Sequence, residues 1–176
     1  MKYLFLSISI TFLFIACNFG NAKQPANWKS YSAKNYTISY PSDWVLDSAR
    51  SEVDLFLFSP TDYKTPLYNE NINLLIQPKQ NGEPGAYDLD DYVALSQKQV
   101  EEHGGTLLAS ERKKDDLGEF HLFSYFAELN GTKFKFKQHV WMINGNAYLL
   151  TYAGSPDGVD PYEKTVDSIF SSFIVK

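Results

Sequence analysis

The sequence contains almost no cysteine, with Cys17 as the only one among 176 residues. A scaffold held together by disulfide bonds is therefore excluded. An excess of positive charge is also missing, because 16 basic side chains stand against 21 acidic ones. The resulting formal net charge of -5 argues against a nucleic-acid partner, since such proteins bind phosphates with lysine and arginine.

Short motifs with a defined catalytic or nucleotide-binding chemistry are missing as well. The sequence has no HExxH, GxSxG, GxGxxG, CxxC or P-loop pattern. The serine of Gly154-Ser155-Pro156-Asp157-Gly158 stands one position too early for the nucleophile elbow of a hydrolase, and the segment is typical of a turn. We therefore expect a protein that is not an enzyme and that holds no cofactor.

The N-terminus is the clearest feature that is present. Lys2 precedes an apolar run over residues 3–16, which is too short to cross a membrane as a stable helix and is typical of a cleavable signal. Its end, Phe14-Ile15-Ala16-Cys17, resembles the bacterial lipobox, whose cysteine becomes the lipidated first residue of the mature chain. The alternative is a soluble secreted protein that is cleaved near a cysteine.

We predict three parts of the chain from this pattern. Residues 1–16 form a lipoprotein signal peptide, and residues 17–27 comprise the lipidated Cys17, carrying acyl chains such as palmitate, and a flexible tether. Residues 28–176 form one folded domain, and the 44% of hydrophobic residues in the whole chain provide ample core material. The expected location is the bacterial cell envelope, on the periplasmic or outer surface, with a monomer attached to the membrane through its lipid.

The domain shows both strand and helix patterns. Apolar or alternating segments at 36–40, 53–58 and 72–77 predict strands, with a short extended piece at 44–46. Asp88 opens a predicted helix that ends at Gly104-Gly105. A second predicted helix has Asp160 as its N-cap, Pro161 in its first turn and Glu163 completing a capping box.

Two Asn-Gly pairs, at 130–131 and 144–145, predict a three-stranded meander over residues 118–129, 132–143 and 146–153. Tight turns would fix the register and place His121 opposite Val140, and His139 opposite Leu122. One face of this meander is then apolar, with Phe123, Tyr125, Ala127, Phe134, Phe136, Val140, Met142, Ala147 and Leu149. The other face is apolar at one end, with Phe120, Leu122, Trp141, Tyr148 and Leu150, and charged at the other, with Glu128, Lys133, Lys135 and Lys137.

This pattern predicts an α+β fold with a central antiparallel β-sheet and helices on both faces, the second face being covered only over its apolar half. The segment 36–44 (YTISYPSDW), the segment 71–78, the double Asn-Gly meander and the closing Val166-x-x-Ile169-x-x-Ser172-Phe173 resemble the PsbP-like family. The resemblance covers residue 28 to the end. It implies an α-β-α sandwich and a mostly non-enzymatic role, in a family that includes an extrinsic photosynthetic subunit, bacterial lipoproteins and envelope proteins, and binders of a small GTPase.

Metal sites are not favoured by the sequence. The predicted register points His121 and His139 to opposite faces of the sheet, so that only a β-bulge would bring them together. His103, near a helix end, is more simply a cation at the negative end of the helix dipole. The acidic pairs Asp90-Asp91 and Asp115-Asp116 match no calcium-loop spacing and are better explained as caps and turns.

The surface offers one binding candidate. Lys133, Lys135 and Lys137 alternate along one strand, near Phe126, Tyr148 and Tyr152, and two long loops at 59–71 and 78–87 carry Tyr63, Tyr68 and Tyr87. We expect Lys133, Lys135, Lys137, Tyr63, Tyr68 and Tyr152 to contact a protein partner in the envelope. The plainer interpretation is a solvated strand that lysine keeps soluble.

A different function, a carrier of small molecules or lipids, is the alternative hypothesis. Its pocket would lie between the partly covered sheet face and a helix, lined by Phe120, Trp141 and Tyr148. A cavity at these residues would favour the carrier, whereas a filled sheet face would favour docking of a partner.

Overall fold

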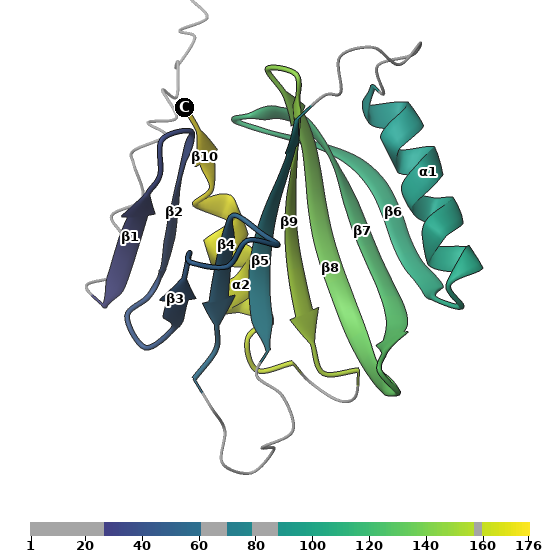
Figure 1. The fold of residues 1–176 in the computed structure, drawn as a ribbon, viewed down its shortest axis with the longest axis horizontal. Coiled ribbons are helices and arrows are strands. Elements are labelled where there is room, and N and C mark those ends of the chain that lie inside the picture. The colour runs from purple at the N-terminus through teal and green to yellow at the C-terminus, as the bar shows by residue number, and fades with distance from the viewer. Residues whose placement is uncertain (1–26, 61–69, 79–87, 157–159) are drawn as a thin grey trace, which may run out of the picture.

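The computed structural model describes residues 27–60, 70–78, 88–156 and 160–176. These residues form a seven-stranded and a three-stranded antiparallel sheet with two helices, α1 and α2 (Figure 1). The predicted α+β class, an antiparallel sheet with helices on both faces, is confirmed. The predicted signal peptide and lipidated Cys17, together with Tyr63, Tyr68 and Tyr87, lie outside the described residues.

The large sheet contains the predicted meander at its centre. Its strand order is β3-β4-β5-β9-β8-β7-β6, and β6 is a charged edge strand that the sequence analysis did not predict. The strands are β3 (Val45–Asp47), β4 (Leu55–Phe58), β5 (Asn71–Pro78), β6 (Thr106–Asp115), β7 (Gly118–Leu129), β8 (Thr132–Ile143) and β9 (Asn146–Gly154).

Both Asn-Gly pairs form the expected tight turns. Asn130, Gly131, Asn144 and Gly145 all have positive φ, between 51° and 78°, as a two-residue hairpin turn of this type requires. The register of β7 against β8 places His121 opposite Val140 and Leu122 opposite His139, as predicted.

The small sheet has the order β1-β2-β10, with β1 (Trp28–Ser32), β2 (Tyr36–Pro41) and β10 (Ile174–Val175). The sequence predicted only the middle strand. Tyr36, Ile38 and Tyr40 of β2 are buried and join the core beneath α2. The hydroxyl of Ser172, just after α2, donates to the carbonyl of Ser39 at 3.1 Å and so ties the end of α2 to this strand.

Helix α1 (Leu89–Glu102) begins as predicted. The Asp88 carboxylate accepts hydrogen bonds from the backbone N–H groups of Asp90 and Asp91, both at 2.9 Å. Its C-terminus is followed by Gly104 at φ 75°.

Helix α2 (Glu163–Ser171) begins later than predicted, and the expected capping box is absent. Tyr162 is the N-cap residue, with no side-chain cap bond. The Asp160 carboxylate instead accepts from the backbone N–H of Tyr162 at 2.8 Å, which makes an Asx-turn ahead of the helix. Glu163 is then the first helical residue, so it does not stand at the third helical position that a capping box requires.

Two cores lie on the two sides of the large sheet. On the α1 side, Leu89 packs with Phe123, Val140, Ala147 and Leu149. The core on the α2 side is larger, because β2, β4, β5 and α2 add side chains that the meander alone did not reveal. Helix α2 packs on the apolar part of this face through Val166, Ile169 and Phe170, and Asp167 on its side reaches Lys137 of β8.

Candidate functional site

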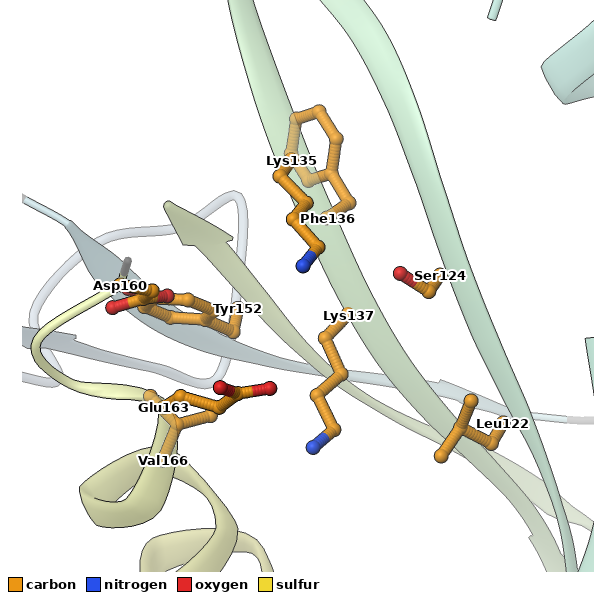
Figure 2. A pocket seen from close by; sticks show the side chains of 9 residues that line it. All are labelled: Leu122, Ser124, Lys135, Phe136, Lys137, Tyr152, Asp160, Glu163 and Val166. Carbon is orange, nitrogen blue, oxygen red and sulfur yellow. The ribbon is translucent and has the colours of Figure 1, made fainter. Parts of the chain in front are cut away.

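A pocket of about 200 Å³ lies where the sheet emerges from under the first turn of α2. Strands β7, β8 and β9 form its floor, and the start of α2 forms one wall (Figure 2). The lining residues are Leu122, Ser124, Lys135, Phe136, Lys137, Tyr152, Asp160, Glu163 and Val166.

The three predicted lysines of β8 point to this side of the sheet because they alternate along the strand. We call Lys133, Lys135 and Lys137 the lysine strand. The ammonium of Lys137 pairs with Asp167 of α2, and that of Lys133 lies 4.6 Å from the centre of the Phe126 ring. Lys135 has no ion-pair partner among the residues that the structure describes, so its charge is available to a ligand.

Gly154 leaves space beside Lys135. The two residues are opposite each other in the pairing of β8 with β9, so no side chain projects from β9 at this point. The ring of Tyr152 fills part of the space, since a Cβ built on Gly154 would stand 2.6 Å from its Cε1. A larger residue at position 154 would displace that ring from the pocket floor.

Tyr152 belongs to the pocket floor and not to an exposed rim. Its side chain is only 4% exposed, which differs from the contact surface that the sequence analysis expected. Burial, followed by the negative charge of Asp160, raises the pKa of Tyr152 far above its usual value. The hydroxyl lies beside the Asp160 carboxylate and meets no described partner in good hydrogen-bond geometry. Tyr152 is therefore neutral at any physiological pH.

Acidic side chains line the pocket opposite the lysines. Asp160 comes from the turn before α2, and Glu163 is the first residue of the helix. In Figure 2 the Glu163 carboxylate and the ammonium groups of Lys135 and Lys137 point into the same space. The site thus presents both signs of charge over a short distance.

The pocket predicted for a lipid carrier is filled. The side chains of Phe120, Trp141 and Tyr148 are at most 6% exposed. The ring of Phe173 lies 5.5 Å from that of Trp141 and 6.1 Å from that of Tyr148, between ring centres, and occupies the proposed space. The prediction that these three residues line a cavity is therefore wrong.

The histidines do not form a metal site. His121 packs on the α1 side, where its Nε2 lies 2.7 Å from Ser110 Oγ, whereas His139 packs on the α2 side among aromatic rings. His103 is the C-cap residue of α1, with Nδ1 2.8 Å from the carbonyl of Gln99. Within the described ranges, no three histidine, cysteine, aspartate or glutamate side chains gather as metal ligands would.

The acidic pairs act in caps, turns and ion pairs. Asp90, in the first turn of α1, pairs with Arg112 of β6. One carboxylate oxygen of Asp115 accepts from the backbone N–H of Leu117 at 2.9 Å, and the other accepts from Trp141 Nε1 at 3.0 Å. These contacts agree with the structural interpretation of the acidic residues.

The contact between Ser110 and His121 was not foreseen, because β6 itself was not predicted. Gln97 of α1 donates to Ser110 Oγ at 2.7 Å, so the three side chains link the helix to β6 and β7. A serine nucleophile needs a histidine whose second nitrogen is oriented by an acceptor. The Nδ1 of His121 is buried without such an acceptor in the described part of the chain.

Comparisons with solved structures identify the fold. Cyanobacterial PsbP (CyanoP) from Synechocystis sp. PCC 6803 matches with a TM-score of 0.60 at 18% identity, over 89% of this chain and 96% of that one. LpqN, involved in cell envelope biogenesis of Mycobacterium tuberculosis, matches with a TM-score of 0.59 at 11% identity, over 85% and 90%. The Ran-binding protein Mog1p of Saccharomyces cerevisiae matches with a TM-score of 0.53 at 11% identity, over 85% and 95%.

The expected PsbP-like fold is thereby confirmed. No family model matches the sequence, and no curated protein is significantly similar to it. None of the helices in the described residues is long and apolar enough to cross a membrane. At these low identities the likeness concerns the fold and not the activity.

Proposed function

We propose that this chain, which shares its fold with CyanoP, LpqN and Mog1p, is a non-enzymatic binding module of the bacterial cell envelope. It docks a membrane-associated protein partner through the lysine strand and is held at the membrane by acyl chains on Cys17. The observation that carries the proposal is the ammonium of the half-buried Lys135, which lies at a pocket and has no ion-pair partner among the described residues, on a protein whose overall charge is negative. A local basic stripe on an acidic protein orients the approach of an acidic partner surface by electrostatic attraction.

The structural neighbours support this role. LpqN is involved in cell envelope biogenesis, and Mog1p is a Ran-binding protein. The lipobox-like tetrad before Cys17 supports an envelope location independently of the fold.

Reversing the charge of two lysines tests the docking surface. Lys133→Glu combined with Lys135→Glu should lower recovery of the partner from detergent-solubilised envelopes at low salt by at least about tenfold, because like charges oppose the encounter. Lys137 is left unchanged, since its pair with Asp167 connects β8 to α2. Quantitative mass spectrometry of the co-purified proteins measures the effect.

The matched control reverses Lys34 and Lys114, which are also exposed and lie away from the pocket. It changes the net charge equally and should recover the same proteins as the wild type. If both double variants and the wild type recover identical sets of proteins in identical amounts, the lysine strand is not the docking surface.

The lipid anchor is tested by Cys17→Ala. This change removes the thiol that would carry the acyl chains, so we expect the protein to move from the sedimented membranes to the soluble fraction. Ser7→Ala, which keeps the cysteine in place, should leave the distribution unchanged. Continued sedimentation of the Cys17→Ala protein with membranes would show that something other than acylation holds it there.

A further inference from the structure

We infer that the pocket between β8 and α2 binds a small zwitterion of the amino-acid class, one that carries a carboxylate and an ammonium group on a short skeleton. This is a small-molecule site in addition to protein docking, and it does not depend on the proposed partner. The inference rests on the two signs of charge, the floor and the size of the pocket.

The cationic side comes from β8. Lys137 already pairs with Asp167. Of the two lysines that line the pocket, Lys135 is therefore the one without an ion pair among the described residues. Gly154 stands opposite Lys135, and the ring of Tyr152 fills part of the space that the glycine leaves, so a ligand would reach the Lys135 ammonium from the pocket side. A ligand carboxylate placed there would gain a charge-assisted hydrogen bond.

The anionic side comes from the start of α2. Glu163 is the first helical residue, and its carboxylate points into the pocket (Figure 2). Asp160 uses one oxygen on the backbone N–H of Tyr162, and its charge adds to that of Glu163. These carboxylates would accept hydrogen bonds from a ligand ammonium.

A ligand with one charge fits this arrangement poorly. A simple anion that reaches Lys135 also meets the negative charges of Asp160 and Glu163, and a simple cation that reaches Glu163 meets the positive charge of Lys135. A zwitterion satisfies both sides at once.

The floor and the volume limit the skeleton of the ligand. Leu122 and the buried Val166 supply apolar contacts, and the neutral ring of Tyr152 completes the floor. A space of about 200 Å³ is below the range of drug-sized ligands, so it suits a single amino acid with a short apolar side chain.

Binding of leucine to the whole protein, compared with leucine blocked at its ammonium or at its carboxylate, tests the inference. Titration of leucine into the labelled protein, followed by NMR, should give saturable shifts at Lys135, Tyr152 and Glu163. N-acetyl-leucine, which lacks the ammonium, and leucine amide, which lacks the carboxylate, should each bind at least about tenfold more weakly.

Two conservative variants test which pocket residue binds each charged group of the ligand. Lys135→Gln should weaken leucine binding and remove the difference between leucine and leucine amide, while the preference over N-acetyl-leucine remains. Glu163→Gln should also weaken leucine binding, but it should remove the difference between leucine and N-acetyl-leucine, while the preference over leucine amide remains. Lys114→Gln, on the edge strand β6 and not among the pocket residues, should behave as the wild type.

The absence of saturable shifts with leucine through the millimolar range would overturn the inference. So would equal binding of leucine and both blocked forms, which would indicate an unspecific apolar contact. Each variant replaces one exposed or half-buried charged side chain with a neutral one, so we expect the fold to be retained. The amide spectrum of each variant without ligand checks this directly.

Discussion

Acidification from about pH 7 to about pH 4.5 should lower the free energy of unfolding of the wild-type protein by roughly 2–3 kcal/mol more than that of a His139→Phe variant. The cause is the imidazole of His139, which lies among three aromatic rings on the α2 side of the sheet. Its ring centre is 4.6 Å from Phe120, 4.8 Å from Phe170 and 5.5 Å from Trp141. Its Nε2 is buried and has no hydrogen-bond partner among the described residues.

This environment disfavours the charged imidazole. Burial, and then the nearby Lys137, lower the pKa of His139 from 6.5 to about 3, with Lys113 adding to the effect and Asp167 opposing it. The unfolded chain takes up the proton below pH 6.5, whereas the folded chain does so only near pH 3. The stabilisation is thus complete above pH 6.5 and is lost as the pH falls toward 3, at up to about 1.4 kcal/mol per pH unit.

Phenylalanine at position 139 removes the proton-binding group and preserves the ring contacts, so the variant should be at least as stable as the wild type near neutral pH. Urea unfolding at several pH values measures the difference. The unfolding free energy of the variant should still fall with pH, but less steeply, because burial and Arg112 also lower the pKa of His121. His103→Gln, at the exposed end of α1, is the control. Parallel pH profiles for the wild type and His139→Phe would contradict the explanation.

The Ile169→Ala variant should lose about 3 kcal/mol of unfolding free energy, since truncation of a buried isoleucine leaves a cavity that the neighbours fill only in part. Ile169 is 0% exposed and belongs to the core that joins α2, the small sheet and the large sheet. The loss should appear as a lower urea midpoint with an unchanged slope.

Lys164→Ala, on the exposed side of α2, is the matched control and should change stability by less than about 0.5 kcal/mol. If Ile169→Ala were as mild as this control, α2 would not be packed on the sheet as described. The pocket would then lose its anionic wall, because Asp160 and Glu163 reach it only through the position of this helix.

The meander could be predicted from the sequence because its information is local. Each Asn-Gly pair specifies a turn with positive φ, and a tight turn sets the register of both strands. The start of α1 at Asp88 is equally local, since the cap bonds reach only two and three residues ahead. The edge strand β6 was missed because its exposed residues 111–115 are all charged and resemble a polar loop.

The pocket could be predicted only in part. Alternation along β8 was enough to place the lysine strand on one face, but the distance from that face to Asp160 and Glu163 depends on how α2 packs. The burial of Tyr152 depends on a glycine two residues later in the same strand, whose effect is visible only in three dimensions. The predicted carrier lining failed for a related reason, because Phe173 follows α2 and reaches Trp141 only through the packing of that helix.

Photo-crosslinking in living cells tests the docking surface most directly. A photoreactive amino acid placed at position 135 should form an adduct of defined mass with one envelope protein, and the same group at position 114 on the edge strand β6 should form none. Adducts that are absent at position 135, or that are identical at both positions, would contradict the docking role of the lysine strand.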